Sequence, residues 1–130
     1  MSQAEAFLSG KEEKQIISAI KKAEMNTSGE IRVHIDEVSE TEVFKRAKEA
    51  FIALAMDKTE NRNGVLFYVS VKDREFAICG DVGIDKVTPD DFWQDIKDTV
   101  IGHFRRSEFV EGLVRGVEMA GESLKVYFPY

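Results

Sequence analysis

Cysteine, long apolar runs and histidine are scarce in this sequence. The single cysteine, Cys79, excludes a disulfide within the chain, and its place in a strand pattern predicts a buried thiol that packs as a small apolar side chain. No apolar stretch approaches the length of a transmembrane helix, so we expect no direct insertion into a membrane. Residues 1–5 carry no basic segment and no apolar segment follows, so no secretory signal is predicted. A cytoplasmic location fits these absences.

Basic residues are outnumbered by acidic ones. The 24 Asp and Glu residues against 18 Lys and Arg residues give a formal net charge of −6, which disfavours nucleic acid or an anionic membrane as a partner. A metal cation is easier to accommodate. The two histidines, His34 and His103, lie far apart in the chain, and His34 falls on the polar face of a predicted strand. A solvated surface position is therefore favoured over a histidine metal site.

Several common catalytic and binding motifs are also missing. The sequence contains no GxxxxGK[ST], GxGxxG, HExxH or GxSxG pattern, so P-loop, dinucleotide, zincin and hydrolase-elbow chemistry lack support. A cysteine phosphatase loop needs an arginine six residues after the cysteine, where this chain has Asp85. An EF-hand calcium loop placed on residues 59–70 fails because its first and twelfth positions are Thr59 and Ser70.

The stretch Val65–Val69 is apolar at every position, which predicts a strand covered on both faces. With 130 residues, 43% of them hydrophobic and 32% charged, the chain has the size and composition of one domain that spans residues 1–130. We therefore expect an α/β domain, in which helices lie above and below a small sheet.

The chain order adds the connections. Apolar spacing predicts helices over residues 10–25, 41–56, 88–104 and from 107 onward, and strands over 30–38, 65–71 and 75–79. Ser9 and Glu12 have the spacing of a capping box at the start of the first helix. The last helix has an apolar stripe of Val110, Leu113, Val117, Ala120 and Leu124. Phe44 belongs to the predicted buried stripe of the second helix, and Thr88 with Pro89 is typical of a helix start. The three-residue connection from Lys72 to Arg74 predicts an antiparallel hairpin, so the sheet is expected to be mixed. The result is a three-layer α/β/α sandwich with about four main helices.

A mixed sheet of this order brings the start of two strands and the end of the third to one rim. That rim would gather Glu30, Arg62, Asn63 and Asp81. Asp81 follows a glycine, and Asp85 comes four residues later beside Gly83, in a loop that lets backbone carbonyls approach a ligand. Carboxylates and carbonyls suit a hard cation such as Ca²⁺ or Mg²⁺. The alternative is that the two aspartates only cap turns.

An anion is the second ligand considered for this region. Arg62 and Asn63 would hold it above the rim, and Trp93 would form a wall of the pocket if Phe92 faces the sheet. The alternative for Trp93 is half-buried packing. At the opposite rim, Arg74 belongs to a mixed-charge group around the hairpin, for which a solvated turn is a sufficient explanation.

The order of these motifs resembles a known family. The segments Gly29–Val33, Asn63–Leu66, Asp73-Arg74 and Gly80–Ile84, followed by Phe104, Phe109, Gly112-Leu113 and Gly116, resemble the TPM domain over about residues 7–128. The family is named after a thylakoid-lumen phosphatase, a photosystem II repair protein and a nematode receptor modulator. The resemblance implies an α/β/α sandwich, divalent-cation binding and, for plant members, a weak acid phosphatase activity. Many exported members carry an aromatic residue at the position of Asp81 and a glutamate at that of Asp85.

Three functions follow as hypotheses. The first is a cation-binding domain with Asp81, Asp85 and Glu30 as metal ligands and Asn63 or a carbonyl completing the shell. The second is a non-catalytic module with a protein partner in a larger, membrane-associated assembly, which predicts an exposed apolar patch near residues 127–130. The third is a metal-assisted phosphatase in which Arg62 or Arg74 stabilises the phosphoryl oxygens.

Overall fold

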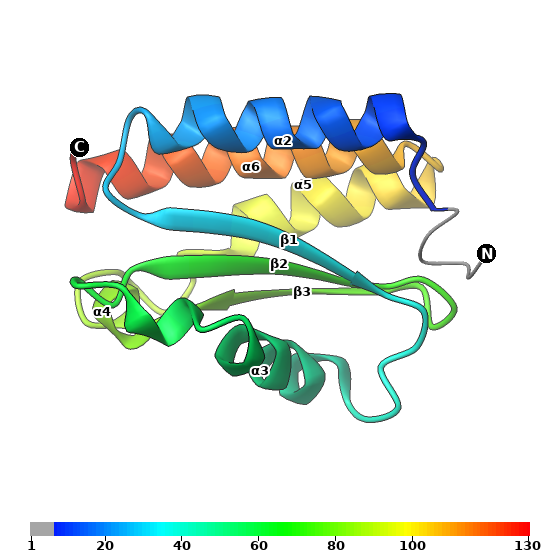
Figure 1. The fold of residues 1–130 in the computed structure, drawn as a ribbon, viewed down its shortest axis with the longest axis horizontal. Coiled ribbons are helices and arrows are strands. Elements are labelled where there is room, and N and C mark those ends of the chain that lie inside the picture. The colour runs from blue at the N-terminus through cyan, green and yellow to red at the C-terminus, as the bar shows by residue number, and fades with distance from the viewer. Residues whose placement is uncertain (1–6) are drawn as a thin grey trace.

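The computed structural model describes residues 7–130 (Figure 1). The elements in chain order are α2 (Gly10–Glu24), β1 (Glu30–Asp36), α3 (Val43–Ala53), the 3₁₀ turn η1 (Met56–Lys58), β2 (Gly64–Ser70), β3 (Glu75–Gly80), α4 (Val82–Asp85), α5 (Gln94–Arg105) and α6 (Phe109–Tyr127). The strand order is β1-β2-β3, with β1 parallel to β2 and β3 antiparallel to it. The predicted mixed sheet is confirmed.

Three layers surround this sheet. In Figure 1, α2, α5 and α6 lie on one face, α3 lies on the other, and the short α4 sits at one end. The all-apolar stretch forms the central strand, and every residue of β2 is buried. Val65, Phe67 and Val69 belong to the core beneath α2, α5 and α6, whereas Leu66 and Tyr68 pack with α3. The α/β/α sandwich is confirmed.

Helix α6 is the longest element and the best predicted one. Its apolar stripe of Val110, Leu113, Val117, Ala120 and Leu124 is buried as expected. Its glycines allow close packing, because a Cβ on Gly116 would lie 2.6 Å from a methyl of Val100 and one on Gly121 would lie 2.7 Å from Cβ of Ala23. Small residues thus bring α5 and α2 against α6.

The start of α2 is fixed by a local cap, and the turn after it contacts the C-terminal tail. Ser9 Oγ accepts a hydrogen bond from the Glu12 backbone N–H, and the Glu12 carboxylate accepts one from the Ser9 N–H, which is the predicted capping box. After the helix, Thr27 pairs with Pro129 in an isolated β-bridge. The Ser28 N–H donates to the Phe128 carbonyl, so the C-terminal tail docks beside the start of β1.

Two helix predictions were wrong. The helix expected to begin at Thr88 begins at Gln94, and the Thr88 hydroxyl donates to the Ile84 carbonyl instead of capping. The preceding segment expected to be a loop forms α4, with Asp81 as its N-cap. The Thr88 hydroxyl thus closes the turn after α4 through a local hydrogen bond, and this bond replaces the predicted cap.

The second helix was placed correctly, but its buried face was partly misassigned. Ala47, Ala50 and Phe51 are buried, while Phe44 is 41% exposed and lies under the Lys48 ammonium. Among residues 7–130, no helix combines the length and apolar character needed to cross a membrane.

Candidate functional site

The rim predicted from strand order exists. Glu30 pairs with Gly64 across β1 and β2, Val65 pairs with Gly80 across β2 and β3, and the Asp81 N–H donates to the Gly64 carbonyl. The starts of β1 and β2 and the end of β3 therefore lie side by side. The structure brings the predicted residues of this rim to one end of the sheet.

Asp81 is the most buried acid of this rim, and its charge is paired. Its side chain is 4% exposed and accepts two hydrogen bonds from Arg62, at 2.7 Å from Nε and 2.9 Å from Nη2. The backbone N–H of Val82 donates a third, at 2.7 Å. The hydrogen bonds between Arg62 and Asp81 raise the pKa of the Arg62 guanidinium, and the negative charges of Asp81 and Asp57 raise it further. The prediction that Asp81 caps a turn is confirmed, and the pairing with Arg62 was not foreseen.

The loop that carries Arg62 is fixed against α4 by backbone contact. A Cβ on Gly83 would lie 2.1 Å from the Asn61 carbonyl oxygen, so only glycine allows this approach. The Gly83 N–H donates to the Arg62 carbonyl at 2.9 Å. Arg62 itself has a left-handed φ of 50°. Main-chain contacts and the ion pair between Arg62 and Asp81 therefore both fix the position of this loop beside Asp81.

Asn63 secures the same loop from the other side. It is 1% exposed, its side-chain amide donates to Ser28 Oγ, and its backbone N–H donates to Thr59 Oγ1. In this arrangement Asn63 joins the loop to the turn before β1. Ligand binding by Asn63 stays a prediction.

One polar atom in this region lacks a partner. Asp57 Oδ1 is buried and has no hydrogen-bond partner within residues 7–130. The other carboxylate oxygen of Asp57 lies 3.6 Å from the Lys58 ammonium, whose side chain is 75% exposed. Because a buried carboxylate oxygen without a donor is costly, Asp57 is an acid with unused coordinating capacity next to the Arg62 loop.

The three predicted metal ligands differ in their surroundings. The Glu30 carboxylate accepts from Arg32 Nε at 2.9 Å, Asp81 is paired with Arg62, and Asp85 is exposed on α4. Within the described part of the chain, no three His, Cys, Asp or Glu side chains converge as a metal site would require. Calcium or magnesium binding by this set stays a prediction, and it requires Arg62 to leave Asp81.

The two candidate catalytic arginines lie at opposite ends of the sheet. Arg62 precedes β2, and Arg74 lies in the turn between β2 and β3. Seven extended residues separate those ends by roughly 20 Å. The two arginines therefore cannot act on one phosphoryl group. Trp93 is half-buried and packs over Gly80, where a Cβ would lie 2.9 Å from its indole ring. Its role as the wall of a ligand pocket stays a prediction.

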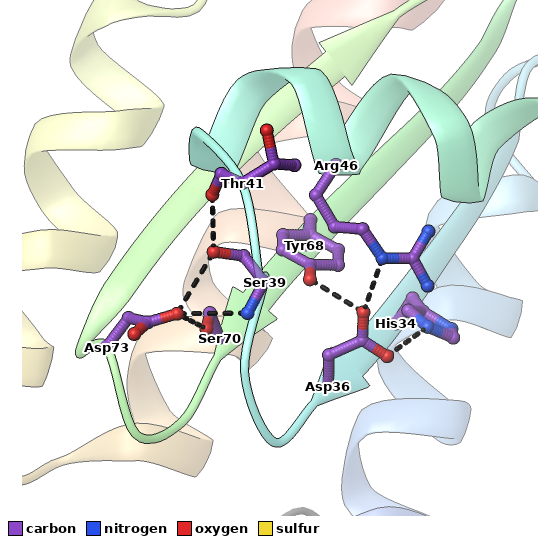
Figure 2. Close-up of polar contacts among 8 residues, drawn as sticks. All are labelled: His34, Asp36, Ser39, Thr41, Arg46, Tyr68, Ser70 and Asp73. Carbon is purple, nitrogen blue, oxygen red and sulfur yellow. Dashed lines mark hydrogen bonds and ion pairs between the residues drawn. The ribbon is translucent and has the colours of Figure 1, made fainter.

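The opposite rim holds a polar network that the sequence did not reveal (Figure 2). Asp36, at the end of β1, accepts a 2.6 Å hydrogen bond from the Tyr68 hydroxyl and lies 3.1 Å from Arg46 Nε and 2.9 Å from His34 Nε2. Burial raises the pKa of Asp36, but hydrogen bonds from Tyr68 and His34 and the charges of His34 and Arg46 leave it below its ordinary value. His34 stacks on Tyr68 and is half-buried. Its side chain is 31% exposed, so the predicted solvated position is only partly correct.

Asp73 organises the hairpin turn in the same view. Its carboxylate accepts hydrogen bonds from the hydroxyls of Ser70 and Ser39 and from the Ser39 N–H. These bonds lower the pKa of the Asp73 carboxyl. The turn was interpreted as simply solvated, yet Asp73 ties it to the segment between β1 and α3.

A family model described as the TPM domain matches residues 1–123. The chain belongs to the TPM domain family. The NMR structure of BA42 from the psychrophilic bacterium Bizionia argentinensis has a TM-score of 0.90 and 50% identity, covering 95% of this chain and 86% of that one. No curated protein matched.

Two more distant structures share the fold alone. The N-terminal domain of cg2496 from Corynebacterium glutamicum has a TM-score of 0.72 and 14% identity, covering 90% of this chain and 74% of that chain. An N-terminal domain from P. gingivalis has a TM-score of 0.71 and 20% identity, covering 94% and 79%. The fold of the TPM domain is therefore retained where little sequence is shared.

Proposed function

We propose that this TPM domain binds a divalent cation, Ca²⁺ or Mg²⁺, at Asp81, and that Arg62 is the internal cation that the metal displaces. The observation that carries the proposal is the combination of a buried carboxylate with an exposed counter-ion. The side chain of Asp81 is 4% exposed, whereas that of Arg62 is 46% exposed. The site thus has a positive charge that can leave without disturbing the core.

The buried charge of Asp81 needs a partner at all times. A carboxylate removed from water needs a compensating positive charge or hydrogen bonds, so Asp81 must be paired in every state of the protein. Arg62 supplies the pairing when no metal is bound. Because its guanidinium reaches solvent, Arg62 regains hydration when it swings away, which lowers the cost of exchange.

Asp57 supplies the second argument. Its buried Oδ1 lacks a partner among the described residues, and its charge acts on Arg62. A cation in place of the guanidinium would be bound by the Asp81 carboxylate and attracted by the charge of Asp57, which already acts on Arg62. Asp85, one helical turn after Asp81, adds a further negative charge nearby. Such an open site with few protein ligands is expected to bind in the range of about 10⁻⁴–10⁻³ M.

The test is a titration followed by amide NMR. Wild-type protein titrated with CaCl₂ or MgCl₂ should shift the amides of residues 57–63 and 80–85. Asp81→Asn should lose the response, and Arg62→Gln should bind at least fivefold more tightly because the competing cation is gone. Lys86→Gln, which removes one charge just beyond α4, is the matched control and should change the affinity less than twofold.

Two results would contradict the proposal. One is a wild-type response that survives in Asp81→Asn, which would place the ion elsewhere. The other is an Arg62→Gln variant that binds no more tightly than Lys86→Gln, which would reduce the effect to net charge.

A protein partner is the second function with an observation in its favour. Near the C-terminus Val126 is 72% exposed and Tyr130 is 91% exposed. A Val126→Ser/Tyr130→Ser variant should lose the partner in a cross-linking pull-down, while Ile52→Ser, an apolar position of α3 that is 59% exposed, should retain it. Equal retention by both variants would count against this surface. Catalysis stays a prediction from family resemblance.

A further inference from the structure

A hollow of the described structure lies at the hairpin end of the sheet, away from Asp81. Its volume is about 1240 Å³, and it is bounded by the end of β2, the start of β3, the second half of α5 and the start of α6. We call it the hairpin hollow.

The floor of the hairpin hollow is apolar. It includes Phe76, Ile101, Phe104 and Phe109. The three phenylalanine rings form a row. The ring centroids of Phe76 and Phe104 are 5.7 Å apart, and those of Phe104 and Phe109 are 5.4 Å apart. Phe104 and Phe109 are only half-buried, so aromatic surface continuous with the core faces the hollow.

The rim of the hairpin hollow is basic. Lys72 and Arg74 come from the hairpin, and Lys97 and Arg105 come from α5, whereas Glu75 is the one acid among the lining residues. All four cations are exposed, and within residues 7–130 none of them forms an ion pair. This is the reverse of the acidic balance of the whole chain.

The acid inside the hairpin does not pair with these cations. Asp73 stands between Lys72 and Arg74 in sequence, but it is not a lining residue, and its carboxylate accepts hydrogen bonds from Ser39 and Ser70 (Figure 2). Its lowered pKa keeps Asp73 negative at pH 7, yet the lining itself still carries four positive charges against the one negative charge of Glu75.

We propose that the hairpin hollow binds an anionic amphiphile, a single-chain molecule with a carboxylate or phosphate head. The chain would lie on the phenylalanine floor, where removal of apolar surface from water drives binding. The head would be held by the lysines and arginines of the rim, which suit both carboxylate and phosphate. The size and the mixed lining are those of a small-molecule site.

An acidic peptide fits the hollow less well. A peptide carries a donor and an acceptor on every residue and needs matching groups along its length. The lining side chains offer few, since the Ser70 hydroxyl already donates to Asp73 and Ser107 carries the other lining hydroxyl. The outer edge of β3 does offer backbone groups, so a peptide is the competing ligand that the test must exclude. A ligand with one charged head and an otherwise apolar chain needs no hydrogen-bond partners along that chain.

The test uses the full chain in EDTA, so that the cation site plays no part. Decanoate and decyl phosphate, each below its critical micelle concentration, are titrated and followed by amide NMR. Shifts should be confined to residues 69–76 and 97–109, and comparison of the two ligands shows which head is preferred. Decyltrimethylammonium and decyl maltoside, which carry the same chain with cationic and neutral heads, should bind at least fivefold more weakly.

Variants separate charge at the rim from charge in general. Lys97→Gln/Arg105→Gln should weaken decanoate binding at least fivefold, while Lys21→Gln/Lys125→Gln, which removes the same charge outside the hollow, should change it less than twofold. The proposal is overturned if the four head groups bind equally, if both double variants behave alike, or if no lining amide shifts. It is also overturned if a Glu/Leu peptide binds more tightly than either anionic amphiphile.

Discussion

At the scale of single residues, the hydroxyl of Tyr68 carries a clear stability role. Tyr68 is fully buried and donates to Asp36, which is also held by Arg46 and His34. We expect Tyr68→Phe to lower the free energy of unfolding by about 1–3 kcal/mol at pH 7, because a hydrogen bond to a partly buried charge is lost while the ring remains. Urea denaturation measures this difference.

The same pair predicts how stability depends on pH. The pKa of Asp36 is below its ordinary value of 3.8 in the folded protein, so its contribution is complete above that value and is lost as pH falls through the folded pKa. The pKa of Tyr68 is raised by burial and by its bond to Asp36. Its contribution is complete below the ordinary value of 10.0 and is lost as pH rises above it. The stability gap between wild type and Tyr68→Phe should therefore shrink at both extremes, and a constant gap from pH 2 to 11 would contradict the assignment.

Cys79 gives a second prediction at this scale. The thiol is buried, and burial raises its pKa from 9.0 to about 11, so the thiolate fraction at pH 8 falls about hundredfold from this cause alone. We expect no measurable reaction with a thiol reagent such as DTNB in the native protein and one equivalent in 6 M guanidinium. Rapid native labelling would show that β3 opens readily.

At the scale of elements, two helical glycines should respond oppositely to the same substitution. A Cβ on Gly116 of α6 would lie 2.6 Å from Val100 and 2.8 Å from Phe67, whereas one on Gly102 of α5 would have its nearest neighbour, Arg106, at 3.9 Å. Gly116→Ala should cost about 1–3 kcal/mol through overpacking. Gly102→Ala should gain about 0.5–1 kcal/mol through helix propensity. Thermal unfolding of the two variants checks the sign, and destabilisation by both would mean that α5 is tighter than described.

The elements show where sequence reasoning succeeds. The capping box of Ser9 predicted where α2 begins, because it is a local signal between residues three apart. The stripe of α6 predicted the buried face of that helix, because it repeats over several turns. The prediction at Thr88 failed because its hydroxyl bonds backward to the Ile84 carbonyl, in a turn after α4 that the sequence pattern does not mark. The prediction at Phe44 failed because Phe44 lies in the first turn of α3, while the residues buried by this helix, Ala47, Ala50 and Phe51, lie further along it.

At the scale of the whole molecule, strand order was enough to place the candidate site but not to describe its state. An antiparallel hairpin on a parallel pair forces Asp81 beside the loop before β2, and the structure confirms this. Sequence spacing does not reveal that Arg62 bends back in a left-handed conformation to pair with Asp81, nor that Asp57 Oδ1 is left without a partner. Similarly, Asp36 and Tyr68 are 32 residues apart in the chain, so their contact depends on the register of β1 and β2.

The account as a whole depends on exchange between Arg62 and a metal ion at Asp81. The most direct measurement is anomalous diffraction from a crystal soaked in MnCl₂, in which Mn²⁺ stands in for Mg²⁺ or Ca²⁺. The account predicts an anomalous peak within coordination distance of the Asp81 carboxylate, with the Arg62 guanidinium turned into solvent. A peak confined to other sites, with Arg62 still bonded to both oxygens of Asp81, would contradict it.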